Sequence, residues 1–127
     1  MSDKTENNIR IVLKGWGKEI IFADTDKYCG KLLCLNNNCE TSVHYHMKKD
    51  ETWYLQSGEI LLTYVDTDIG EWNEIILKEG DSFKINPGVP HGAKAILDSI
   101  IFEVSTLDTI EDNYRIRKGD SQKKGER

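Results

Sequence analysis

The stretch of the chain that decides the fold covers residues 41–58 and reads TSVHYHMKKDETWYLQSG. A Lys-Lys-Asp turn in it separates two β-type segments, residues 41–47 and 52–56. His44 and His46 are two residues apart on the first segment, so both side chains project from one face, about 6 to 7 Å apart along the backbone. The two imidazoles can therefore share one metal ion.

Two further residues complete a candidate ligand set. Glu51 follows the turn and opens the next segment, so an antiparallel hairpin is expected to bring its carboxylate back beside the two imidazoles. His91 lies in the run NPGVPHG, residues 86–92, where prolines and glycines make a rigid turn that delivers the imidazole at a strand start. Three imidazoles and a carboxylate suit one divalent ion, Zn, Mn, Fe or Ni, with positions left for water or substrate. The alternative is a structural site with no open position on the metal, in which the ion only stabilises the fold.

Outward from this stretch, residues 9–105 form a run of short β-type segments broken by Gly, Asn, Asp and Pro. Besides 41–47 and 52–56, strands are predicted at residues 19–23, 31–35, 60–65, 74–77, 82–85, 92–96 and 99–104. Strands at spacings of roughly ten residues favour an all-β sandwich or closed barrel in a single domain.

Length and charge limit the classes of protein that remain. The 127 residues fit one domain, and no apolar run approaches the roughly 20 residues of a membrane-spanning helix. The net charge of -5 argues against nucleic acid as a partner. Residues 1–10 show no secretory signal, which predicts a cytoplasmic location, and Cys29, Cys34 and Cys39 are expected to be reduced thiols.

The spacing of the candidate ligands resembles that of a known family. The pattern H-x-H-x4-E-x6-G over residues 44–58 resembles the first motif of the cupins, without the glycine that opens it there. The pattern G-x5-N-x-G-x2-H over residues 80–91 resembles the second motif, with Asn86 where cupins usually have Pro and Ala95 where they often have Asn. The resemblance implies a double-stranded β-helix, or jelly-roll barrel, over residues 9–117. Residues 1–8 are then expected to be flexible and residues 118–127 to form a mobile basic tail.

Four runs point to a narrower resemblance. They are Trp16-Gly17, the S-x-H-x-H-x4-E-x-W pattern of residues 42–53, FEVST at residues 102–106 and EDNYR at residues 111–115. Their order is similar to that in the cupin domain of type II mannose-6-phosphate isomerases, from Trp16 to about Asp120. This resemblance implies interconversion of the aldose and ketose forms of a sugar or sugar phosphate through a cis-enediol, with the metal as Lewis acid.

Three residues are candidates for catalytic roles under this interpretation. Glu51 is a candidate base if it is only loosely ligated, and Lys31 is another if it points into the barrel with a pKa lowered by the ion. Arg115 stands where the resembling isomerases carry an Arg near the active site, and it could bind a phosphate with paired donors. A surface charge is the ordinary alternative for Lys31 and for Arg115.

Candidate substrate contacts are the aromatic residues Trp53 and Tyr64, for the C–H face of a sugar ring, and Lys84 and Lys94, for a phosphate. Core packing explains the two aromatic residues equally well. Two other functions stay open: an iron-dependent dioxygenase with the same four ligands, and a non-catalytic sugar-binding cupin.

An apolar face predicts a homodimer. Val43, Tyr45 and Met47 alternate with the histidines and must cover the opposite side of their strand. An apolar surface there packs either against the second sheet or against another subunit.

Overall fold

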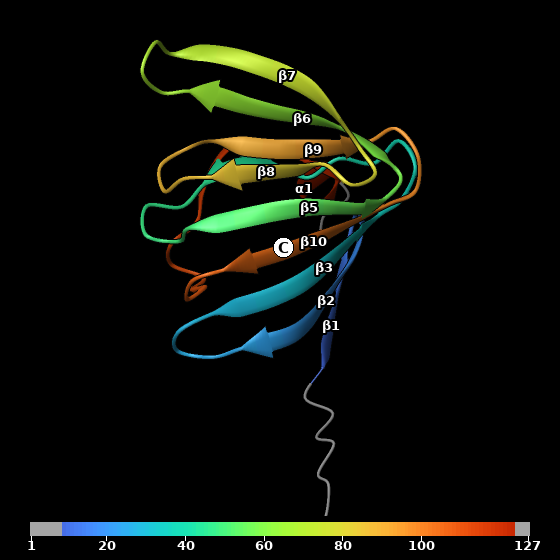
Figure 1. Ribbon diagram of the computed structural model, residues 1–127, viewed down its shortest axis with the longest axis vertical. Helices are drawn as coiled ribbons and strands as arrows, with labels where there is room; N and C mark the ends of the chain where they lie inside the picture. Colours follow the sequence, from blue (N-terminus) through green and yellow to red (C-terminus); the bar gives the residue numbers. More distant parts are fainter. Residues whose placement is uncertain (1–8, 124–127) are drawn as a thin grey trace, which may run out of the picture.

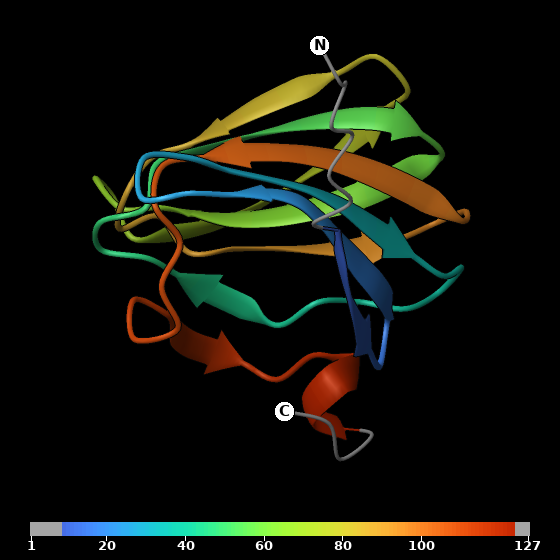
Figure 2. The same ribbon diagram turned by 90° about the horizontal axis from the view of Figure 1, so that it is seen from below.

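Two antiparallel sheets make up most of the chain (Figures 1 and 2), in a computed structural model that describes residues 9–123. In the six-stranded sheet the order is β1 (Arg10–Lys14), β2 (Gly17–Asp24), β3 (Cys29–Leu35), β10 (Ser99–Ser105), β5 (Glu51–Ser57) and β8 (Ser82–Ile85). In the five-stranded sheet it is β11 (Tyr114–Arg117), β4 (Val43–Tyr45), β9 (His91–Ala95), β6 (Glu59–Asp66) and β7 (Glu71–Lys78). The all-β fold expected from the sequence is confirmed.

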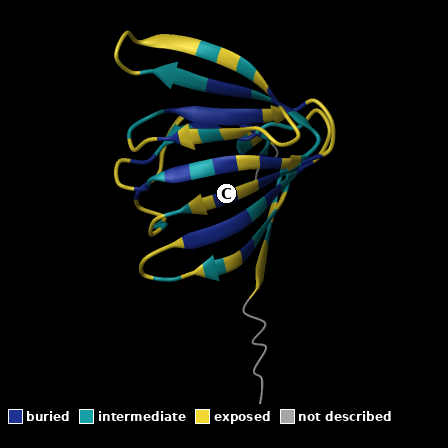
Figure 3. Ribbon diagram, viewed as in Figure 1, coloured by how far each residue is buried: buried dark blue, intermediate teal, exposed yellow. Residues whose placement is uncertain are grey.

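The sheets enclose a core because side chains alternate between their two faces. On β5, Trp53 and Leu55 are buried whereas Tyr54 and Gln56 are exposed, and Figure 3 shows similar alternation along other strands. The buried apolar cluster contains Trp16, Leu33, Leu35, Trp53, Leu55, Ile60, Leu62, Leu77, Ile85, Ala93, Ala95 and Ile101. Both sheets contribute to it, so the barrel does not depend on a metal ion for its core.

Two strands were not predicted from the sequence, β1 and β11. Each lies at the edge of its sheet, and all four residues of β11 are exposed. A strand with no buried face lacks the apolar alternation that signals a strand, and β11 is defined by its pairing with β4. The short helix α1 (Asp120–Lys123) follows β11, and Figure 2 shows it next to the end of β1.

The segment after β11 differs from the expected mobile tail. The backbone N–H of Asp120 donates to the carbonyl of Glu40 at 2.9 Å, and the Asp120 carboxylate accepts from the Glu40 N–H at 2.7 Å. The N–H of Gly15 donates to the hydroxyl of Ser121, which is buried. Polar contacts therefore hold this segment in place. The sequence pattern did not indicate them, because the segment has no apolar residues that would predict packing. Residues 124–127 of the predicted tail and residues 1–8 of the predicted flexible N-terminus lie outside the described residues.

Within residues 9–123, no helix has the length and apolar character needed to cross a membrane.

Candidate metal centre

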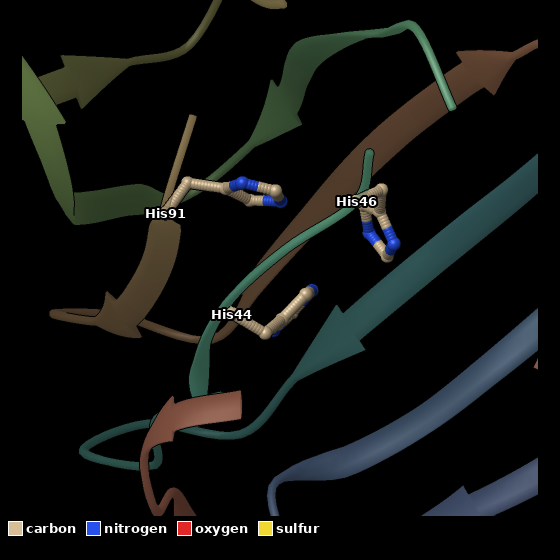
Figure 4. A group of neighbouring side chains, drawn as sticks. All are labelled: His44, His46 and His91. Atoms are coloured by element: carbon tan, nitrogen blue, oxygen red, sulfur yellow. The ribbon is translucent and has the colours of Figure 1, made fainter. Parts of the chain in front are cut away.

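The three histidines converge inside the barrel (Figure 4). His44 lies on β4, His46 follows directly after that strand, and His91 opens β9. One ring nitrogen from each lies within 4.8 Å of the other two, and His44 is the register partner of His91 on the neighbouring strand. The prediction that these side chains meet is confirmed. The three cysteines form no disulfide, and none belongs to this group of nitrogen atoms.

Each imidazole is oriented by a main-chain carbonyl that faces its Nδ1 atom. The pairs are His46 with Asp112 at 2.6 Å, His91 with Val89 at 2.9 Å, and His44 with Ser42 at 3.2 Å. Because a carbonyl oxygen can only accept, a neutral His46 or His91 ring has its proton on Nδ1, and the lone pair on Nε2 is left for a metal. Nδ1 of His44 also lies 3.0 Å from the hydroxyl of Ser42, which can donate or accept. Burial, followed by the neighbouring His91 and His46, lowers the pKa of His44 well below its ordinary value, so this ring is neutral.

Glu51 approaches the histidines from the opposite sheet. Its Oε1 accepts from the indole N–H of Trp53 at 3.0 Å, and its Oε2 lies 3.3 Å from Nε2 of His91 and 3.5 Å from Nε2 of His46. The expected β4–β5 hairpin is wrong, because β4 and β5 belong to different sheets and the 46–50 turn crosses between them. The four predicted ligands are nevertheless brought together, with Glu51 in contact with two of the three histidines.

Two atoms at this point fit a metal ion. Oε2 of Glu51 and Nε2 of His91 are both buried and have no hydrogen-bond partner in the described structure. When the ring is neutral and the carboxyl ionised, both atoms are acceptors, so two lone pairs face each other at 3.3 Å. Such a contact is unfavourable in a buried site unless a proton or a metal ion lies between the two atoms. The donor set, imidazole and carboxylate, is one that Zn, Mn, Fe and Ni accept.

A buried ionic cluster adjoins Glu51. Nζ of Lys49 lies 2.8 Å from Glu103, 3.7 Å from Asp108 and 3.9 Å from Glu51. Nζ of Lys31 lies 2.8 Å from Asp108 and 3.7 Å from Glu19. Two lysines thus face four carboxylates, which formally leaves two negative charges uncompensated. One divalent cation would balance them.

The charges in the cluster set the protonation states of its members. Burial works against the ionised form of Glu103, but Lys49 and Lys31 outweigh it and lower the pKa to about 2. Burial likewise works against the charged form of Lys31, but Glu103, Glu19 and Asp108 raise its pKa above the ordinary value. In the metal-free protein the pKa of Lys31 is therefore raised, the opposite of the shift that a nearby ion was expected to cause. With its ammonium group protonated at neutral pH, Lys31 is a hydrogen-bond donor and not a base.

The turn that delivers His91 is joined to the other ligands. Gly88 has a φ of 85°, a conformation that favours glycine, and its N–H donates to the carbonyl oxygen of His46 at 2.6 Å. Asn86, which replaces the usual proline, accepts from the N–H of Val89 at 3.2 Å. The departure from the cupin motif at this position is thus compatible with a closed turn.

Asp112 is a functional residue that the sequence analysis did not single out. Its carboxylate accepts hydrogen bonds from the backbone N–H groups of Met47, Lys48 and Lys49, at 2.7 to 3.0 Å. Desolvation works against its charge, but these donors lower its pKa below the ordinary value. Because its main-chain carbonyl also faces His46, Asp112 holds both a ligand ring and the turn that leads to Glu51. Its only sequence signal was its membership of the EDNYR run.

The predicted aromatic contacts differ in their surroundings. Trp53 is 2% exposed, lies edge-on to His91 at a ring-centroid distance of 5.3 Å, and donates to both Glu51 and Glu103. It therefore positions carboxylates and is not open to a sugar ring. Tyr64 is half-buried, is the register partner of His91 on β6, and packs against Phe83 at 5.1 Å.

The predicted cationic contacts do not converge. Arg115 is exposed and pairs in register with His44, so both side chains lie on the same face of their sheet. Lys84 lies on the outer face of β8, where it is paired with Asp50. Lys94 lies on the outer face of β9, between two buried alanines. Only Arg115 of these three is thus near the histidines.

The comparisons with known proteins define the family. The model of the cupin domain matches residues 32–107, and the chain therefore belongs to the cupin family. A curated relative, the 3-hydroxyanthranilate 3,4-dioxygenase of Podospora anserina, is 34% identical over 58 residues, which is 44% of this chain. The matched region spans 31% of that relative's length.

Solved structures share the fold at low sequence identity. An RmlC-like cupin from Shewanella frigidimarina has a TM-score of 0.70 at 19% identity, over 85% of this chain and 92% of that chain. KdgF from Halomonas sp. has a TM-score of 0.64 at 18% identity, over 86% and 87%. Oxalate decarboxylase from Bacillus subtilis has a TM-score of 0.74 at 18% identity, over 86% and 30%. The narrower resemblance to type II mannose-6-phosphate isomerases stays a prediction.

Proposed function

We propose that this protein is a metal-dependent cupin enzyme that interconverts the aldose and ketose forms of a sugar or sugar phosphate. The observation that carries the metal dependence is the contact between two buried, unpartnered acceptors, Oε2 of Glu51 and Nε2 of His91. A divalent ion held by His44, His46, Glu51 and His91 would supply Lewis acidity toward the carbonyl and adjacent hydroxyl oxygens of the sugar.

The isomerase is favoured because the runs that carry the resemblance contribute residues to the site or next to it. FEVST contributes Glu103 to the buried ionic cluster. EDNYR contributes Asp112, which faces His46, and Arg115, which is next to His44. These two runs lie outside the motifs that contain the candidate metal ligands. A resemblance to cupins that was limited to those motifs would not account for the contacts of the two runs with the site.

Different residues of the chain would have different roles in the isomerisation. Glu51 is the candidate to carry a proton between the two sugar carbons if it is only loosely ligated, because its Oε2 lies on the side of the histidines while its Oε1 accepts from Trp53. Lys31 would donate a hydrogen bond to a sugar oxygen, consistent with its raised pKa. Arg115 would bind a phosphate and Tyr64 would contact the ring, each from a position beside a histidine.

The test is a reconstitution of metal-free protein with Zn, Mn, Fe and Ni in turn, followed by incubation with mannose 6-phosphate in deuterated water. We expect metal-dependent formation of the ketose with deuterium incorporated at the carbon that exchanges. His46→Ala should abolish both metal binding and turnover, whereas Lys84→Ala, on the outer face, should leave both unchanged. Unchanged sugar without deuterium exchange, with every metal, would contradict the isomerase and favour a sugar-binding protein.

The curated relative supports a second candidate, an iron-dependent cupin dioxygenase. That relative is named as a dioxygenase and is 34% identical over its matched segment. Oxygen uptake measured beside isomerisation separates the two functions. Oxygen consumption with Fe alone, and no ketose with any metal, would favour the dioxygenase.

A further inference from the structure

The outer face of the five-stranded sheet has a hollow of about 350 Å³, a size typical of small-molecule sites. Its floor lies on β9 and β6, where Gly92 and Thr63 are register partners and Gly92 has no side chain to fill the space. His91, the residue before Gly92, has its imidazole on the inner face of β9 with the other histidines. The sheet therefore separates the hollow from the candidate metal centre.

Strand β11 forms one side of the hollow. Val43 of β4 lines it and is almost fully buried, and Tyr45 stacks on Tyr114 of β11 with the ring centroids 5.1 Å apart. This is the side of β4 on which the sequence analysis predicted contact with another subunit, and β11 covers part of it. The homodimer stays a prediction.

A β-bulge in β11 brings a guanidinium group to the hollow. Arg115 pairs in register with His44. Two residues later Arg117 pairs with Val43, because the register shifts between the two arginines. Register partners share a face, so Arg115 lies on the side of the histidines and Arg117 on the outer face. A regular strand would have put both arginines on the same face.

The guanidinium group of Arg117 is oriented by an aromatic ring. Its Cζ lies over the ring of Trp72 on β7, 5.5 Å from the ring centroid. The contact joins the two edge strands of the sheet, β11 and β7. A cation–π contact uses the face of the planar group and leaves the N–H donors at its edge for a ligand. Within residues 9–123, Arg117 forms no ion pair that would occupy these donors.

The charges around the hollow favour an anion. Its lining includes three cations and two carboxylates, which are Lys94, Arg117, Lys123, Glu40 and Glu74. Lys123 lies 3.1 Å from Glu40, so these two charges offset each other. Lys94, like Arg117, forms no ion pair within residues 9–123, and Glu74 is the remaining carboxylate of the lining. Positive charge is thus in excess here, although the whole chain carries a net charge of -5.

A buried hydroxyl group at the floor of the hollow has no partner. Thr63 is 6% exposed, and its side chain is on the outer face because the preceding residue, Leu62, belongs to the core. The hydroxyl forms no hydrogen bond within residues 9–123. A buried hydroxyl without a partner is unfavourable, and this one can both donate to and accept from a molecule in the hollow.

We propose that this hollow is a second binding site, for a small phosphomonoester that also carries hydroxyl groups. The phosphate would lie against Lys94 and Arg117, because its charge of about -1.5 to -2 at neutral pH matches two unpaired cations. A guanidinium group can also donate two parallel hydrogen bonds to it. The hydroxyl groups would bind Thr63 and the carboxylate of Glu74. No candidate metal ligand faces the hollow, so the proposal does not rest on the proposed function.

The test is a titration of the metal-free, ¹⁵N-labelled full chain with glycerol 3-phosphate at constant ionic strength, followed by NMR. We expect saturable shifts of the amide resonances of Thr63, Glu74 and Lys94, and no shifts with uncharged glycerol. Arg117→Ala should weaken this binding by about 10–100-fold, because it removes charge-assisted hydrogen bonds. Thr63→Val, which removes a neutral hydroxyl, should weaken it by about 3–10-fold.

Arg115→Ala is the matched control, since it removes the same charge from the same strand but on the side of the histidines. It should leave the affinity measured at these resonances unchanged. An equal loss in the two arginine variants would overturn the proposal, as would a wild type without saturable shifts or an unchanged affinity in Arg117→Ala. The same spectra show whether each variant is folded. Lys94→Ala, on a different strand, repeats the test and should also weaken binding by about 10-fold or more.

Discussion

The inward-facing side chains of the barrel divide into an apolar region and a charged region, and the boundary between them is sharp. On β10, Ile101 is opposite Leu33 of β3, and two residues further along Glu103 is opposite Lys31. All four are buried. The first pair belongs to the apolar core and the second to the ionic cluster beside the candidate ligands. The comparison suggests that stability comes mainly from one region and chemistry from the other.

The largest expected effect comes from a substitution that disturbs only the apolar region. Leu62 is fully buried in the core, so Leu62→Ala should lower the free energy of unfolding by about 2–5 kcal/mol. Leu61→Ala, at the next position and on the outer face, should cost clearly less. Urea denaturation of metal-free protein measures both. Metal bound per folded molecule should be unchanged in Leu62→Ala, and a loss of metal there would contradict the division into two regions.

The next effect tests the charged region through pH. The pKa of Glu103 is about 2 in the folded protein against an ordinary 4.5, so its ionised form stabilises the fold. That contribution is fully present above pH 4.5 and is lost as the pH falls toward 2, and it is on the order of a few kcal/mol. Chemical denaturation from pH 6 to 2.5 should show a steep loss in the wild type. Glu103→Gln should flatten that slope; an identical slope in both would refute the assignment.

A third prediction concerns the residue that holds a ligand. Asp112→Asn removes one acceptor from the 47–49 turn and should weaken metal binding by about 10–100-fold, because the support of His46 becomes less rigid. Glu111→Gln, at the exposed neighbouring position, is the matched control and should bind metal normally. Competition with a chromogenic chelator gives both affinities. Equal affinities would show that Asp112 has no part in holding the ligand.

The smallest expected effect is that of Glu51→Gln, which should change stability without metal and affinity for metal in opposite directions. Glu51→Gln replaces an acceptor with an amide N–H that can donate to Nε2 of His91, and so removes the facing lone pairs. The metal-free variant should be more stable than the metal-free wild type by about 1 kcal/mol. Its metal affinity should nevertheless fall. Thermal unfolding with a chelator and metal titration test the two halves, and lower stability without metal would contradict the site geometry.

The parts of the site that the sequence predicted are those encoded by local spacing. His44 on β4 and His46 directly after it meet because alternate residues of an extended backbone share a face, and the rigid 86–90 turn fixes where His91 begins β9. Inner strands were also predictable, because burial of one face leaves an alternating pattern. Their pairing was not, so the sequence could not show that Glu51 reaches the histidines from the opposite sheet.

Contacts between distant segments account for the remaining differences. Lys31 has its pKa raised by carboxylates from three other segments of the chain, at Glu19, Glu103 and Asp108. Asp112 faces a ligand that lies 66 residues earlier in the sequence. Neither contact leaves a local pattern. Strands β1 and β11 and the segment at Asp120–Lys123 were missed because none of them has a clearly buried apolar face, and backbone or polar pairing holds them in place.

The hydrogen bond from His46 to the carbonyl of Asp112 has a consequence for biosynthesis. A nascent chain leaves the ribosome from its N-terminal side, so all the candidate ligands emerge before the residue that orients one of them. Until residue 112 has left the exit tunnel, the His46 ring lacks the acceptor that selects its tautomer. The four candidate ligands therefore reach their final arrangement only after the segment that carries Asp112 has folded against them.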